Sequence, residues 1–92
     1  MGGSGARQRL MVGDGRWWEL GWDPHIRSFF AELYPPLDPS GDPDYMQART
    51  RLGTVDEPIR SILRLEQLVG EPFPAEIRRV LEADRSLRSS WR

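Results

Sequence analysis

The sequence predicts a small α+β domain, with a three-stranded antiparallel meander over 16–22, 26–34 and 45–52 followed by two helices over 56–69 and 74–88. Three observations lead to this fold class. In parts of the first half of the chain, apolar and polar residues alternate with the two-residue period of a half-buried strand. Apolar residues recur every three or four positions in the second half, which is the helical period. Stretches rich in proline and glycine separate these segments.

The first expected strand is the aromatic run RWWELGW, bounded by a glycine and by an Asp-Pro pair. It is rich in strand formers and too short for a helix. Because side chains alternate between the two faces of a strand, one face carries Trp18, Leu20 and Trp22. We predict that this face is buried. Trp17 lies beside Glu19 on the opposite face, so we predict that Trp17 is exposed to solvent.

Residues 24–34 fit two structures. In a helix, Asp23 would be the N-cap and Pro24 the first helical residue, and the apolar residues keep helical spacing as far as Pro35. In a strand, Asp23-Pro24-His25 would form the turn of a hairpin. A small sheet needs about three strands to be stable, which favours the hairpin. The helical alternative for 24–34 stays open.

The third expected strand, 45–52, alternates cleanly and follows a proline-rich loop. Its outward face would carry Tyr45, Gln47, Arg49 and Arg51, and its inward face Met46, Ala48, Thr50 and Leu52. In the loop, Asp38, Ser40, Asp42 and Asp44 have the spacing of a calcium-binding EF-hand loop. Pro43 and Arg49 stand where that loop needs glycine and glutamate, so we predict no metal site.

The first expected helix, 56–69, has a possible capping box formed by Thr54 and Glu57, with Asp56 as the alternative cap, and Gly70 ends it. Its apolar stripe consists of Val55, Ile59, Ile62, Leu63, Leu65 and Val69. Glu66 falls inside this stripe. Because an unpaired buried carboxylate is unfavourable, we predict that Glu66 lies at an uncovered end of the stripe or pairs with an arginine.

The second expected helix, 74–88, begins at Pro74. Its apolar side consists of Ile77, Val80, Leu81 and Leu87. Asp84 interrupts this side, and we predict an arginine partner for it as well. The arginines considered as partners for the two carboxylates are Arg64, Arg85 and Arg88.

Several motifs resemble a group of small proteins from high-GC actinobacteria and their mobile elements, a group with no established function. The motifs are Gly21-Trp22-Asp23-Pro24, Phe29-Phe30-Ala31, Leu52-Gly53 and FPAEIRRVLEAD, and the likeness covers 16–84. The resemblance implies a hairpin that turns at Asp-Pro, with Phe29-Phe30-Ala31 on its second strand. It implies no function.

The remaining boundaries follow from composition. Residues 1–15 contain five glycines and no clear periodicity, and MGGSG resembles a leader left by cloning. We therefore predict a flexible N-terminus over 1–15 and a single small domain over 16–92.

Several classes of function are excluded by what the chain lacks. It has no cysteine, no long apolar run and one histidine, His25. The missing cysteines exclude a disulfide framework and a thiolate metal site, and the missing apolar run excludes a transmembrane helix. With a single histidine, no second one is available for acid–base chemistry. No glycine-rich phosphate loop precedes a helix. We predict a cytoplasmic protein that is not an enzyme and uses no cofactor.

Binding is the function that remains. All 13 basic residues are arginine, and although the chain has a net charge of −1, residues 74–92 carry a net charge of +2. Arginine and tryptophan are typical anchors of protein interfaces. We predict a non-enzymatic accessory module that binds a protein partner or a second copy of itself. The predicted contact residues are Trp17, Tyr45, Arg49, Arg51, Arg78, Arg85, Arg88 and Trp91. The alternative is a nucleic-acid-binding regulator that uses the arginine-rich C-terminal helix.

Overall fold

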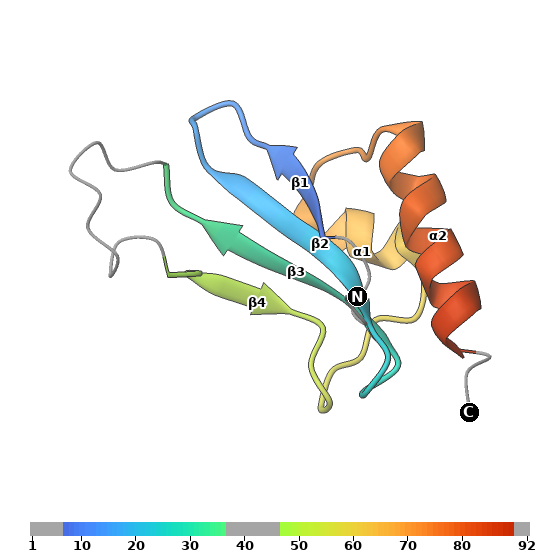
Figure 1. Cartoon of the computed structure of the whole chain (residues 1–92). Coiled ribbons are helices and arrows are strands. Elements are labelled where there is room, and N and C mark those ends of the chain that lie inside the picture. The colour runs from blue at the N-terminus through green and yellow to red at the C-terminus, as the bar shows by residue number, and fades with distance from the viewer. Residues whose placement is uncertain (1–6, 37–46, 90–92) are drawn as a thin grey trace.

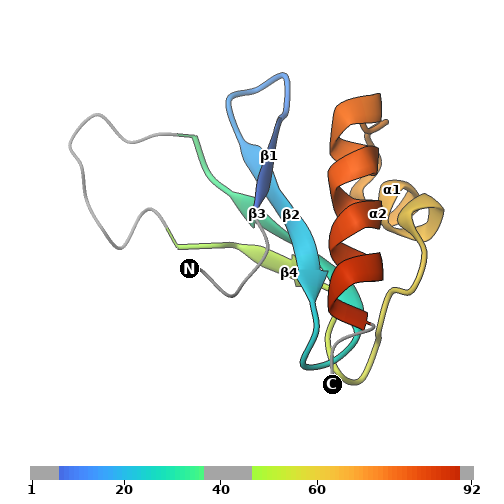
Figure 2. The ribbon, with the colours of Figure 1, turned by 45° about the vertical axis from the view of Figure 1, so that its right-hand side comes forward.

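A computed structural model describes residues 7–36 and 47–89, with side chains to residue 87. A four-stranded antiparallel sheet of order β1-β2-β3-β4 forms one layer, and two helices cover one of its faces (Figures 1 and 2). The elements are β1 (Gln8–Met11), β2 (Trp17–Asp23), β3 (Ser28–Tyr34), β4 (Thr50–Leu52), α1 (Ile62–Val69) and α2 (Ala75–Ser89). The predicted α+β class is confirmed.

The predicted meander is strands β2, β3 and β4, and the helical alternative for 24–34 is wrong. Trp22 pairs with Phe29 and Asp23 with Ser28, so β2 and β3 form a hairpin around the turn at 24–27. The Asp23 carboxylate accepts the backbone N–H of His25 at 3.0 Å. This is the local bond by which an Asx turn stabilises a chain reversal.

Strand β1 corrects the prediction that 1–15 is flexible. It pairs antiparallel with β2, and Leu10 lies opposite Trp18. The turn between the two strands has Gly15 at φ 94°, a left-handed conformation that favours glycine. Gly13-Asp14-Gly15 was the available signal, because glycine and aspartate next to an aromatic strand are typical of hairpin turns.

The third predicted strand is shorter than expected. Only 50–52 of the predicted 45–52 form β4, residues 47–49 are irregular, and residues 45 and 46 lie outside the described part. Thr50 shares the face of Leu52, as predicted, but it is exposed, whereas Leu52 packs against the core. Leu33 holds this segment through its carbonyl, which accepts the N–H of Arg49 at 2.7 Å.

Helix α1 begins six residues later than predicted because tertiary contacts occupy the preceding segment. Ile59 forms an isolated bridge with Phe29, and Ser61 is the N-cap, accepting the N–H of Arg64 at 3.0 Å. The expected capping pair forms only a local turn, in which the Thr54 hydroxyl accepts the N–H of Glu57 at 3.1 Å. Val55, predicted to be buried, is 72% exposed. Leu63, predicted in the same stripe, is also exposed. Helix α2 begins within one residue of its predicted start.

The core lies between the sheet and the two helices. Its sheet side contains the predicted Trp18, Leu20 and Trp22 together with Phe29 and Ala31 of β3. Its helix side is formed by Ile59, Leu65, Phe73, Ile77 and Leu81. The Trp22 and Phe29 rings meet edge to face with centroids 4.9 Å apart, an arrangement favoured by the aromatic quadrupoles.

Candidate anion-binding site

One predicted contact residue, Trp17, lies on the open face of the sheet, the face that the helices leave uncovered. It is not available to contact a partner. Trp17 lies on the predicted face, but it is only 3% exposed, so the prediction of an exposed Trp17 is wrong. Tyr34 stacks on its ring at 5.4 Å, and the Arg9 guanidinium lies 4.8 Å from the ring centroid. The indole N–H donates to Glu19 at 3.2 Å. The neighbouring side chains therefore already cover and satisfy Trp17.

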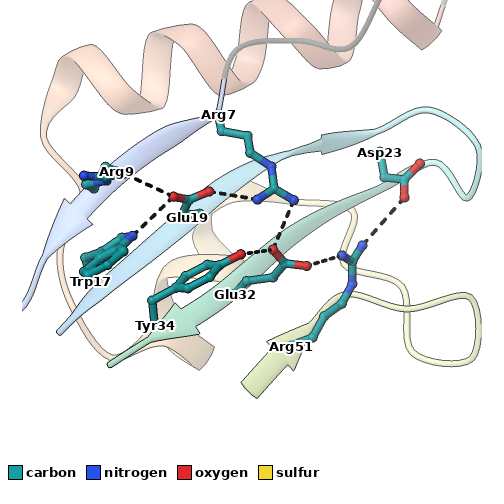
Figure 3. A network of polar contacts seen from close by, with 8 residues as sticks. All are labelled: Arg7, Arg9, Trp17, Glu19, Asp23, Glu32, Tyr34 and Arg51. Carbon is teal, nitrogen blue, oxygen red and sulfur yellow. Dashed lines mark hydrogen bonds and ion pairs between the residues drawn. The ribbon is translucent and has the colours of Figure 1, made fainter. Parts of the chain in front are cut away.

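The charges of this face neutralise one another (Figure 3). Glu19 and Glu32 lie directly opposite across β2 and β3, a like-charge pair that is destabilising by itself. Arg7 bridges them, at 2.8 Å to Glu19 and 3.0 Å to Glu32. Arg51 lies 2.7 Å from Glu32 and 3.6 Å from Asp23. Arg51 is exposed as predicted, but two carboxylates already compensate its charge.

The acidity of Glu19 reflects this network. Burial raises its pKa, but hydrogen bonds from Arg7 and Trp17 and the charges of Arg7 and Arg9 together outweigh burial. The pKa of Glu19 therefore lies below its ordinary value, and the carboxylate stays ionised at neutral pH.

An aromatic ring lies beneath these charges. The guanidiniums of Arg7 and Arg51 lie 5.0 and 4.9 Å from the centroid of Phe30. Gly21, opposite Phe30, makes room for the ring, since a Cβ there would lie 2.7 Å from it. The arginines of this face thus act as packing and ion-pair partners within the fold.

A second predicted contact residue, Arg78, is also paired. Its Nη2 lies 2.6 Å from Glu66, and the same carboxylate oxygen accepts the backbone N–H of Phe73 at 2.6 Å. These two bonds lower the pKa of Glu66. The prediction that Glu66 finds an arginine is confirmed, although Arg78 was not among the partners considered.

The other predicted residues have mixed outcomes. No arginine among the described side chains pairs with Asp84, and its Oδ2 is buried without a hydrogen-bond partner. Arg85 forms an ion pair with Glu82, one turn earlier on α2. Arg49 is exposed just before β4. Tyr45, Trp91, the side chain of Arg88 and the acidic loop considered for calcium lie outside the described part of the chain.

Four arginines of the described segments form no ion pair with a carboxylate: Arg27, Arg60, Arg64 and Arg79. Two of them lie together, because the Nε of Arg60 donates to the backbone carbonyl of Arg27 at 2.8 Å. They lie where the β2–β3 turn meets the C-terminal part of α2 (Figures 1 and 2). Two of these four charges therefore lie together at this end of the molecule, whereas Arg64 and Arg79 lie at other hollows.

An open cavity of about 440 Å³ occupies this place, and we call it the basic cavity. Its lining residues are Trp22, Arg27, Arg60, Arg85 and Ser86. Trp22 is 6% exposed, and its indole N–H is buried without an acceptor. The Nε of Arg85 is also buried without an acceptor. Buried polar groups are nearly always hydrogen-bonded, so two unsatisfied donors beside one cavity need an explanation.

The chain builds this cavity through one unusual residue and one buried bond. Arg27 has φ 53°, the left-handed region that a non-glycine residue enters at a cost of about 1–2 kcal/mol. Ser28, fully buried, accepts the N–H of Ile59 through its hydroxyl at 2.8 Å. This bond holds the segment before α1 against β3 and so brings Arg60 beside Arg27. Strained backbone of this kind is enriched at functional sites.

Comparison with known proteins gave no guide to this site, because no family model, curated protein or solved structure matches the chain. The actinobacterial resemblance therefore stays a prediction. None of the helices in the described segments is sufficiently long and apolar to cross a membrane. Within those segments, no group of three or more histidine, aspartate or glutamate side chains is placed to hold a metal ion.

Proposed function

We propose that this chain is a non-enzymatic binding module that docks on a protein partner rich in acidic side chains, and that the basic cavity is its contact. One observation carries the proposal. The arginines of the open sheet face are neutralised within the fold, whereas Arg27 and Arg60 at the basic cavity have no carboxylate partner.

The chemistry of the cavity suits an acidic segment. Guanidinium groups bind carboxylates through planar, two-pronged hydrogen bonds. The bond from Arg60 to the Arg27 carbonyl fixes part of the Arg60 side chain before a partner arrives, which lowers the entropy lost on binding. Arginine and tryptophan side chains line the cavity, and these residue types often contribute most of the binding energy of an interface.

Nucleic-acid binding through α2, the alternative, has less support. Arg78 and Arg85 are two of the arginines of the C-terminal helix on which this alternative depends, but each is paired with a glutamate. Phosphate contacts by these side chains would have to compete with those ion pairs.

Fluorescence anisotropy with a labelled peptide rich in Asp and Glu tests the proposal. We expect Arg27→Gln and Arg60→Gln each to weaken binding about tenfold, the equivalent of about 1.4 kcal/mol. The matched control is Arg79→Gln, which also removes a guanidinium without a carboxylate partner but lies in a hollow beside α1 and not in the basic cavity. We expect the control to bind like the parent protein.

Two results would contradict this proposal. Equal losses in all three variants would mean that only overall charge matters. Tighter binding of a DNA duplex than of the acidic peptide would favour the nucleic-acid alternative.

A further inference from the structure

We propose that the group recognised in the basic cavity is a phosphate monoester on a side chain of the partner, so that docking is selective for a phosphorylated segment. This inference rests on the proposed function for its partner.

The lining of the cavity consists mostly of donors. Trp22 offers only an indole N–H, and the guanidiniums of Arg27, Arg60 and Arg85 offer only N–H groups. Some of these donors are already used, since Arg60 donates its Nε to a carbonyl and Arg85 donates an Nη to Glu82. The Trp22 Nε1 and the Arg85 Nε have no acceptor and are inaccessible to solvent, so a ligand contacts them only when a lining side chain shifts. A ligand that satisfies them must present acceptor oxygens.

The charge of the cavity selects among such ligands. Three guanidiniums line it, and one of them is paired with Glu82, which leaves a net charge of +2. A phosphate monoester carries about −1.5 to −2 at neutral pH. A carboxylate or a nucleic-acid phosphodiester carries only a single negative charge. The monoester is the ligand whose charge matches that of the site.

The arrangement of the donors points the same way. They come from four separate parts of the chain: β2 supplies Trp22, the β2–β3 turn supplies Arg27, the segment before α1 supplies Arg60, and α2 supplies Arg85. A flat carboxylate has two oxygens, whereas a phosphate monoester has three terminal oxygens that point in different directions. A phosphate can therefore accept from donors on several sides at once. The volume of about 440 Å³ leaves room for the residue that carries it.

The backbone strain at Arg27 allows a substitution that removes the guanidinium without destabilising the fold. Because its φ of 53° suits glycine, Arg27→Gly removes the guanidinium and relieves the backbone at the same time. We expect this variant to keep its thermal stability, so that loss of binding cannot be attributed to unfolding. Arg64→Gln is the matched control, since Arg64 lies on α1 outside the basic cavity and has no carboxylate partner.

The experiment is an NMR titration that follows the indole N–H signal of Trp22. One peptide is tested in three forms, with phosphoserine, with glutamate and with serine at its centre, and free O-phosphoserine is tested in parallel. We expect the phosphoserine peptide to shift the Trp22 signal and to bind at least about tenfold more tightly than the glutamate peptide. Arg27→Gly should abolish the preference, and Arg64→Gln should preserve it.

Each other outcome has a distinct meaning. Equal binding of the glutamate and phosphoserine peptides would overturn the phosphate inference and leave the proposed function standing. Equal affinity for free O-phosphoserine and the phosphoserine peptide would overturn the assignment of the phosphate to a protein partner. An unmoved Trp22 signal with every ligand would overturn the cavity as the recognition site, and with it both proposals.

Discussion

Gly53→Ala is expected to destabilise the protein more than any other substitution considered and to remove a large share of the stability of a domain of this size. A Cβ at this position would lie 2.0 Å from the backbone carbonyl oxygen of Phe29 and 3.0 Å from the Cα of Phe30. Both atoms belong to the central strand β3, paired on both sides, so neither can move away. Gly53 also has φ 85°. Overpacking and left-handed strain together should lower the free energy of unfolding by about 4 kcal/mol or more.

Two other glycines make this prediction quantitative. Gly70 has φ 83° with nothing within 4 Å of an added Cβ, so Gly70→Ala should show strain alone, about 1 kcal/mol. Gly13 has neither strain nor a close neighbour, so Gly13→Ala should change the stability by less than about 0.5 kcal/mol. Urea unfolding of the three variants gives the order. A Gly53→Ala protein as stable as Gly70→Ala would show that β4 does not approach β3 as described.

Phe29→Ala is expected to have the next largest effect. The side chain is fully buried between the sheet and the helices, and its ring contacts Trp22. Truncating a buried phenylalanine typically costs about 3–5 kcal/mol, through lost burial and the cavity left behind. A domain of this size has only about 5–10 kcal/mol in total. Thermal and urea unfolding should therefore show a large loss of stability. Because Trp22 lines the basic cavity and loses its contact with the Phe29 ring, its side chain should also become less firmly packed.

Two controls separate packing from general sensitivity to mutation. Phe29→Leu keeps most of the volume and should be clearly less destabilising than Phe29→Ala. Met11→Ala truncates a side chain that is 60% exposed at the end of β1 and should be nearly neutral. If Phe29→Ala were as mild as Met11→Ala, the core described here would be wrong.

Much of the fold could be predicted because local patterns and tertiary structure agree. The inward face of β2 and the start of α2 follow directly from the two apolar periods. The start of α1 could not be predicted in this way. The bond between Ser28 and Ile59 joins residues far apart in the sequence and draws 59–61 into an extended path before the helix. Tertiary contacts of this kind override local helix signals.

The candidate site was less predictable, for a physical reason. Exposure of a charged or aromatic side chain depends on its cross-strand neighbours, and the sequence did not reveal that Arg9 and Tyr34 cover Trp17. It also did not show that Arg51 meets two carboxylates. Arg27 and Arg60 come together only through the register of the hairpin and the buried serine. A single local hint existed, an arginine at the end of an Asp-Pro turn where glycine or asparagine is usual.

The central claim is that arginines of the open sheet face stabilise the fold, whereas those of the basic cavity bind. Measuring both unfolding free energy and affinity for the acidic peptide in Arg51→Gln and Arg27→Gln tests it most directly. Arg51→Gln should lose about 1 kcal/mol of stability and keep its affinity, because it breaks ion pairs with half-buried carboxylates. Arg27→Gln should keep its stability and lose about tenfold in affinity. The opposite pattern, or the same pattern in both variants, would contradict the claim.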